Sequence, residues 1–226
     1  MCLPCKIHGT TAAIDGRLEE LGLTREILAQ AVKAGLLARR EHTENHPVTS
    51  AGFNTWSEAV RSLRDQLAGE GWEADNTANQ GLTTHEARKL SIAVVPGDKK
   101  TGIEDSTPST RSARGPRTAD AVRANGTGFL FKEMEERIAA LMSMRIDGLW
   151  LLLIYVNEEK QWVQSELSRP TEMSDGGRPT AWSERILLPA INFSSTPDSS
   201  KRTKRTNDTP PVEKSPEIVV EVKRRA

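Results

Sequence analysis

Hydrophobic residues in the first part of the chain recur at the spacing of α-helices. Ile14, Leu18 and Leu21 form one apolar stripe. Between Ile27 and Leu36, apolar side chains return every three or four residues, which predicts a second amphipathic helix. Because no cluster of polar, base-reading residues follows these helices, we expect a helical hairpin that covers a sheet rather than a DNA-binding helix-turn-helix.

Helix-start signals indicate where the second and third helices begin. Thr24 is a favourable N-cap, and Glu26 puts a negative charge in the first turn, where the helix dipole stabilises it. The sequence Thr55-Trp-Ser-Glu58 matches a capping box, which predicts that a third helix begins there. Gly69 is expected to end that helix.

The later part of the chain carries strand patterns instead. Residues 149–156 form a continuous apolar run, typical of a central strand that is covered on both faces. Residues 162–168 alternate between apolar and polar, and residues 183–188 predict a third strand. We expect these three strands to form an antiparallel meander that pairs with the apolar strand 90–95. The remaining predicted elements are a short strand at 72–76 and helices at 119–124 and 127–144.

These elements together predict an α+β fold. A mainly antiparallel sheet of about four strands would be packed by the N-terminal helices and by one central helix. A single domain would span residues 13–192, with a helical part at 13–71 and a sheet part at 72–192, after a flexible leader at 1–12. Residues 193–226 predict a disordered basic tail, because a segment of Ser, Thr, Pro, Lys and Arg cannot offset its ordering entropy by burial.

Charge and cysteine content restrict the partners. Lys plus Arg and Asp plus Glu are equal at 31 each, so any attraction to nucleic acid must be local. The N-terminus lacks the apolar segment of a signal peptide, and the run at 149–156 is too short to cross a bilayer, so we expect a cytoplasmic protein without membrane contact. Cys2, Cys5 and His8 offer three ligands where a closed zinc site needs four, and we predict no metal and no cofactor.

A polar loop at 97–118 is the strongest functional signal in the sequence. Its first part, Gly97-Asp-Lys-Lys-Thr-Gly102, has the glycine spacing of a phosphate-binding P-loop. That motif continues with Lys and Ser or Thr, whereas Ile103-Glu104 follows here, and no helix begins at once. A conventional nucleoside triphosphatase is therefore not expected.

The second part of the loop predicts an anion site. Arg111, Arg114 and Arg117 recur every three residues without an intervening acid, and Thr118 is placed to cap the helix that follows. Guanidinium groups, a hydroxyl and helix N-terminal amides together bind phosphate groups well. We therefore expect a binding protein for a phosphate-bearing ligand, either nucleic acid or a nucleotide. The expected ligand-binding residues are Lys99, Lys100, Thr110, Arg111, Arg114, Gly115, Arg117 and Thr118.

Two alternatives stay open. One is a metal-dependent nuclease, in which Asp98 and Glu166, with Lys160 or Asp75, would hold Mg²⁺ and activate water. Nothing else in the sequence supplies catalytic machinery, so an enzyme is the less favoured class. The other is a protein-interaction module, an inhibitor or accessory factor that contacts its partner through the loop or the tail.

Overall fold

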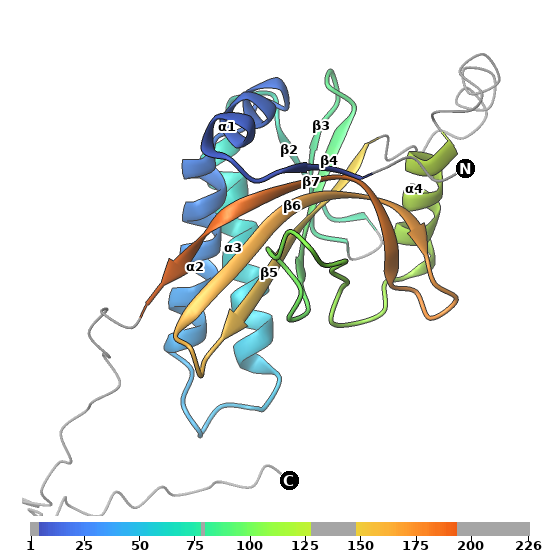
Figure 1. Cartoon of the computed structure of the whole chain (residues 1–226). Coiled ribbons are helices and arrows are strands. Elements are labelled where there is room, and N and C mark those ends of the chain that lie inside the picture. Colours follow the sequence, from blue (N-terminus) through green and yellow to red (C-terminus); the bar gives the residue numbers. More distant parts are fainter. Residues whose placement is uncertain (1–4, 78–79, 128–147, 194–226) are drawn as a thin grey trace, which may run out of the picture.

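One mixed sheet organises the molecule. The computed structural model describes residues 5–77, 80–127 and 148–193. Within these residues seven strands form a sheet in the order β1-β7-β6-β5-β4-β3-β2, flanked by four helices (Figure 1). The strands are β1 (Lys6–His8), β2 (Glu73–Asp75), β3 (Leu82–His85), β4 (Leu90–Pro96), β5 (Leu149–Asn157), β6 (Trp162–Met173) and β7 (Pro179–Asn192). The helices are α1 (Thr11–Glu20), α2 (Arg25–Arg40), α3 (Ser50–Leu67) and α4 (Pro116–Thr127).

The expected sheet of about four mainly antiparallel strands is wrong in both size and direction. The meander β5-β6-β7 is antiparallel and lies beside β4, as predicted. However, β4 runs parallel to β5, with Ser91 opposite Leu149, and β1 runs parallel to β7, with Lys6 opposite Glu184. The chain passes from β4 to β5 through a long connection that contains α4, and such crossovers are what join parallel strands. Apolar alternation along a strand carries no information about that direction.

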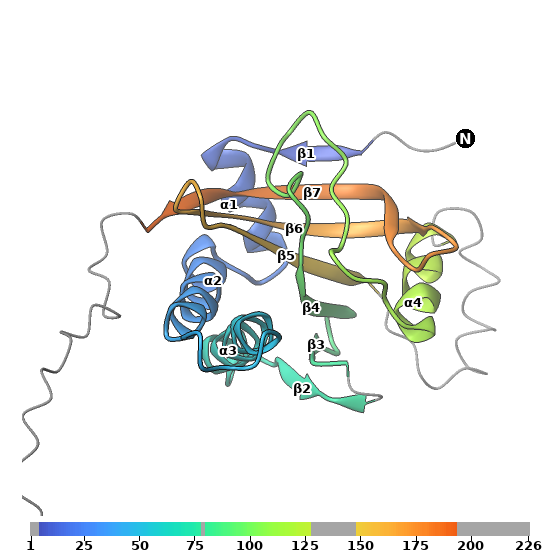
Figure 2. The same ribbon diagram turned by 90° about the horizontal axis from the view of Figure 1, so that it is seen from below.

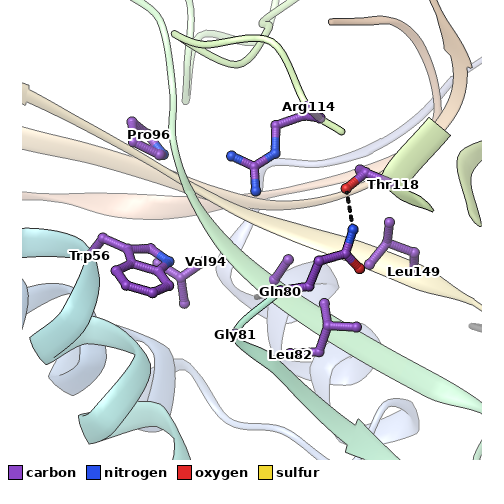
Figure 3. Close-up of a pocket in the computed structure, with 10 residues that line it drawn as sticks. Trp56, Gln80, Gly81, Leu82, Val94, Pro96, Arg114, Thr118 and Leu149 are labelled. Atoms are coloured by element: carbon purple, nitrogen blue, oxygen red, sulfur yellow. Dashed lines mark hydrogen bonds between the residues drawn. The ribbon is translucent and has the colours of Figure 1, made fainter. Parts of the chain in front are cut away.

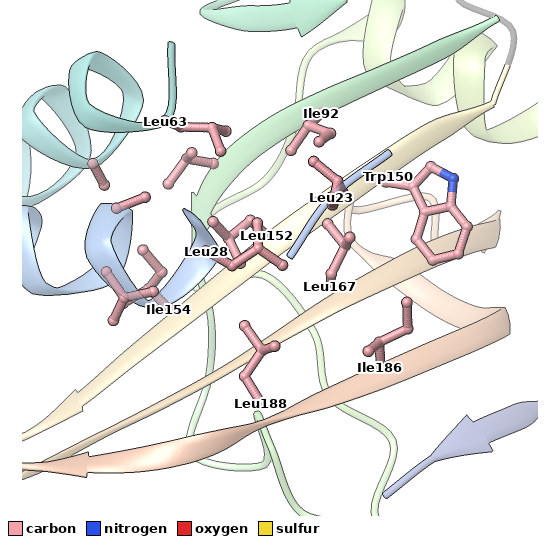
Figure 4. Close-up of a cluster of buried hydrophobic side chains, with 14 of the residues drawn as sticks. Leu23, Leu28, Leu63, Ile92, Trp150, Leu152, Ile154, Leu167, Ile186 and Leu188 are labelled. Atoms are coloured by element: carbon pink, nitrogen blue, oxygen red, sulfur yellow. The ribbon is translucent and has the colours of Figure 1, made fainter. Parts of the chain in front are cut away.

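Helices cover both faces of the sheet (Figure 2). On one face, helices α2 and α3 share a core with Ile92, Val94, Leu152 and Ile154, which are alternate residues of β4 and β5, and α1 contacts β7. Figure 4 shows Ile92, Leu152 and Ile154 in this core. On the other face, α4 contributes Ala121 and Val122 to a smaller cluster. Because β5 is covered on both sides, its continuously apolar sequence is explained.

Helices α2 and α3 pack closely against each other. A Cβ atom on Gly35 would lie 2.5 Å from the carbonyl oxygen of Thr55, so only glycine allows this approach. The predicted capping box is wrong, since α3 begins at Ser50 and Thr55 lies inside it, donating a hydrogen bond from its hydroxyl to the Ala51 carbonyl (2.7 Å). The predicted N-cap at Thr24 is confirmed, since its hydroxyl accepts the Ile27 N–H.

Some sequence predictions fall outside the described residues. They are the helix at 127–144 beyond its first residue, and the basic tail beyond Phe193. At the other end, residues 6–8 of the expected leader form β1, where His8 contacts Glu184 at 2.8 Å. Among the described residues, no helix is both long enough and apolar enough to cross a membrane.

Candidate ligand-binding cleft

A cleft of about 880 Å³ opens where the parallel strands β4 and β5 end. Its floor is formed by residues 94–97 and 154–156 of these strands. One wall comes from the end of α2 and the first turns of α3, and the other from the loop after β4. The carboxyl ends of parallel strands are where open α/β sheets bind ligands, and the volume lies within the usual range for such sites.

Positive charge exceeds negative charge around this cleft. The charged lining residues are Arg39, Asp98, Lys99 and Arg111. Arg39 forms an ion pair with Glu158, whereas Lys99 and Arg111 are exposed and bind no described acid. The backbone of Arg111 is held firmly, because its N–H donates to the Pro96 carbonyl (2.9 Å). The guanidinium of Arg111 is therefore presented to the cleft from a fixed point.

Aromatic side chains form the wall that faces these cations. Phe53 and Trp56 of α3 lie with their ring centroids 5.7 Å apart. Phe53 is 60% exposed, although an aromatic ring on a helix normally gains most by burial. An exposed aromatic ring opposite free cations is suited to a ligand that has both a planar ring and a negative charge.

A smaller chamber of about 220 Å³ continues inward from the cleft. The two cavities share Trp56, Val94 and Pro96. Figure 3 shows the guanidinium of Arg114 projecting into this chamber from the loop, between Trp56 and Gln80. The register of β3 with β4 ends at Leu82 opposite Ala93, which leaves room for the chamber beside the last residues of β4.

The first half of the loop is anchored to the sheet by a buried ion pair. Glu166 of β6 is fully buried and pairs with Arg185 of β7 at 2.7 Å. The Glu166 carboxylate also accepts the Gly102 N–H and the Ser168 hydroxyl, both at 2.7 Å. Arg185 further donates to the carbonyls of Ile103, Glu104 and Ser106. The pair thus holds the loop through one loop N–H and three loop carbonyls.

This arrangement does not bring the proposed nuclease residues together. Glu166 is occupied by Arg185, while Asp98 lines the cleft. Lys160 lies in the β5–β6 turn over the ring of Trp162, and hydrogen bonds from Thr77 lower the pKa of Asp75. In the part of the chain that the structure describes, no three His, Cys, Asp or Glu residues are grouped to hold a metal ion.

The structure separates the eight residues that the sequence assigned to ligand binding. Lys99 and Arg111 line the cleft, whereas Arg114 and Thr118 line the inner chamber. Lys100 is exposed, Gly115 faces open space, and Arg117 lies near Asp75.

The two predicted threonines are buried and already hydrogen-bonded. Thr110 donates from its hydroxyl to the Ser112 carbonyl (2.8 Å), and the Thr118 hydroxyl accepts the Gln80 side-chain amide (3.0 Å). Helix α4 begins two residues before Thr118, at Pro116, which suits the first helical position. Thr118 therefore lies inside the helix rather than at its cap.

Sequence reasoning missed the contribution of the helices. Arg39, Phe53, Trp56 and Gln80 come from segments far from the loop, and only folding brings them to it. Phe53 left one usable signal, since it lies three residues before Trp56 and continues the apolar stripe of α3 at helical spacing. No signal pointed to Gln80.

Comparison of the chain with family models, curated proteins and solved structures gives no match. The candidate site is therefore interpreted from its own geometry.

Proposed function

We propose that this protein binds a phosphate-bearing ligand, a nucleotide or a stretch of single-stranded nucleic acid, in the cleft beside β4 and β5. The proposal rests on the presence of a cationic wall and an aromatic wall in the same cleft. Lys99 and Arg111 supply positive charge on one side, and the exposed ring of Phe53 supplies a stacking surface on the other. Single-stranded nucleic acids are bound in this way, by cations along the backbone and aromatic rings under the bases.

The two walls act on different parts of the ligand. The ammonium of Lys99 and the guanidinium of Arg111 attract phosphate oxygens, and the fork of Arg111 can bind two of them at once. The aromatic wall binds a base through its flat face, and this stacking contact by itself does not distinguish one base from another. Since the whole chain has no net charge, attraction depends on this local excess of cations.

A cytoplasmic setting fits the same proposal. Cys5 is a free, exposed thiol, and both cysteines of the chain lie within its first five residues. No disulfide can then staple the body of the fold, which is usual for proteins of reducing compartments.

Calorimetric titration tests the proposal with nucleoside monophosphates and with short single-stranded DNA and RNA, at about 50 and about 200 mM salt. The double variant Lys99→Ala plus Arg111→Ala is expected to lower affinity by about tenfold or more and to flatten the salt dependence. The matched control is Arg61→Ala plus Arg123→Ala, which removes the same charge from exposed helix surfaces. Absence of binding by the wild type, or equal loss in both double variants, would contradict the proposal.

The aromatic wall needs a separate test. Phe53→Ala removes an exposed ring and should leave folding intact, while loss of a stacked base costs about 1–3 kcal/mol of binding energy. The salt dependence should stay that of the wild type, because no phosphate contact is removed. If Phe53→Ala bound every probe as tightly as wild type does, the proposed stacking of a base on Phe53 would be wrong.

A further inference from the structure

We propose that the inner chamber is a nucleobase pocket that selects guanine. This inference rests on the proposed function, because it assigns the base of a ligand whose phosphate lies in the outer cleft. The chamber and the cleft share Trp56, Val94 and Pro96, so one nucleotide can occupy both. A cavity of about 220 Å³ has room for a single base.

Arg114 provides the main evidence that a ligand binds in the chamber. Its backbone is fixed, since its N–H donates to the Gly177 carbonyl at 2.7 Å. Gly177 has a φ of +70°, and a Cβ there would lie 2.9 Å from the Arg114 carbonyl oxygen. The side chain, by contrast, makes no hydrogen bond or ion pair with any described residue, and its buried Nε has no partner. Buried polar groups are normally satisfied, so the unpartnered Nε of a guanidinium on a fixed backbone suits a ligand that supplies an acceptor.

The walls of the chamber favour a base over a phosphate. Besides Trp56, the apolar lining residues are Leu82, Ala93, Val94, Pro96 and Leu149. A phosphate needs several donors around it, but Arg114 is the one cation here and the Thr118 hydroxyl already accepts from Gln80. Apolar walls instead suit the flat faces of a heterocycle, with the polar groups left for its edge.

Trp56 lies unusually close to the chain that closes the chamber. A Cβ atom on Gly81 would come within 3.0 Å of the indole Cζ2, so glycine at this position lets the ring pack against the backbone. The indole thereby forms a flat, fixed wall. Stacking on such a wall holds a base at the depth where its edge meets Arg114.

The polar groups of the chamber match guanine best. A guanidinium fork binds the two neighbouring acceptors O6 and N7, which guanine presents together, whereas adenine places an N6 donor in the O6 position. The Gln80 amide nitrogen donates to Thr118, and no described residue hydrogen-bonds to the amide oxygen. That oxygen can accept from the N1–H and N2–H donors, which also belong to guanine.

Titration of GMP, AMP, CMP and UMP against wild type and variants tests this inference. GMP is expected to bind about tenfold or more tightly than the others, within the range of one bidentate contact. Arg114→Ala should lower GMP affinity to that of AMP and leave AMP unchanged. Arg114→Lys should not restore the preference, because an ammonium lacks the planar fork. The control Arg111→Ala should weaken all four nucleotides equally, and thermal melts confirm that each variant is folded.

The outcomes separate this inference from the proposed function. Binding of all four nucleotides without preference, or an equal loss of all four in Arg114→Ala, overturns guanine selection and leaves the cleft assignment standing. No binding of any nucleotide or oligonucleotide overturns both. An oligoadenylate with one central guanine, compared with the all-adenine chain, tells nucleic acid from free nucleotide. Tighter binding of the guanine-containing chain, lost in Arg114→Ala, supports the inference for nucleic acid.

Discussion

Arg185 binds the loop at 97–118 and Arg114 belongs to that loop, but the surroundings of their guanidinium groups are opposite. Arg185 is 2% exposed, pairs with Glu166 and donates to three loop carbonyls. Arg114 is held by its backbone, while its side chain contacts no described acceptor. The side chain of Arg185 makes its hydrogen bonds within the fold, whereas the side chain of Arg114 remains available to a ligand.

The difference divides the loop into two parts with separate roles. Residues 102–106 are fixed to β6 and β7 through Glu166 and Arg185. This anchoring holds residues 111–114 over the cleft without using their side chains. A protein that satisfied both arginines internally would be more stable but could not use Arg114 to bind a ligand.

Breaking the anchor is expected to have the largest effect. Arg185→Met leaves Glu166 charged and unpaired in the interior and should lower the free energy of unfolding by about 3–5 kcal/mol. Urea denaturation measures this. The double variant Glu166→Leu plus Arg185→Met should recover much of the loss, because no unpaired charge remains. A loss below about 1 kcal/mol for Arg185→Met would show that the pair is not an anchor.

The turn at the start of the loop should be the next most sensitive position. A Cβ atom on Gly97 would overlap the Thr101 hydroxyl, so Gly97→Ala should cost about 1–3 kcal/mol through overpacking. The cost should fall in a Thr101→Ala background, which removes the hydroxyl. Gly115→Ala is the matched control, since nothing lies within 4 Å of its Cβ position. Equal effects of the Gly97 and Gly115 variants would refute this explanation.

The direct counterpart of the first experiment is Arg114→Met. Removing a half-buried cation whose Nε has no partner should leave stability unchanged or raise it by up to about 1 kcal/mol, while the preference for GMP is lost. Urea denaturation without ligand is the measurement. A loss of stability comparable to that of Arg185→Met would mean that Arg114 is also structural, and the comparison would fail.

A third arginine, Arg17, is ion-paired but more exposed than Arg185, and its pair makes a smaller, pH-dependent contribution to stability. It binds Glu184 through Nε (2.6 Å) and Nη2 (2.9 Å). Burial, the largest single influence, favours a higher pKa for Glu184. The hydrogen bonds and charges of Arg17 and His8 together outweigh it and hold the pKa below its usual range.

The sign of the effect follows from that direction. A lowered folded pKa stabilises the protein above the unfolded value of about 4.3, and the stabilisation is lost as pH falls through the folded pKa. The melting temperature of wild type should therefore exceed that of Glu184→Gln at about pH 5, and this difference should disappear as the pH falls to about 3. Glu20→Gln, which removes a more exposed partner of Arg17, is the control. A difference in melting temperature between wild type and Glu184→Gln that stays constant with pH would contradict this prediction.

Helices and strands could be predicted from the sequence where their buried faces produce a regular spacing of apolar residues. The run at 149–156 became β5, and the period between Ile27 and Leu36 became α2. In contrast, β1 and β3 contain three and four residues, too few for a pattern, and they owe their structure to neighbouring strands. Pairing across long sequence distances, such as β4 with β5, depends on tertiary contacts that no local window contains.

The site could be predicted only on its loop side. Charge spacing pointed to Lys99 and Arg111, which line the cleft, but it equally pointed to Thr110, whose hydroxyl is used by Ser112. Glu166 looked like either a catalytic or a surface acid, because alternation along β6 cannot reveal that Arg185 on the next strand neutralises it. Which polar residue is satisfied and which is free depends on partners far away in the chain.

The pairing of β1 with β7 has a consequence for how the chain folds during synthesis. His8 and Glu184 are 176 residues apart, yet they belong to neighbouring strands at one end of the sheet. As the ribosome releases the chain from its N-terminus, β1 must wait for β7, the last of the described strands. Helices α2 and α3 and strands β2, β3 and β4 can pack in the meantime, because their contacts with one another are local. The edge of the sheet at β1 is therefore formed when the first and the last of the described strands meet, late in folding.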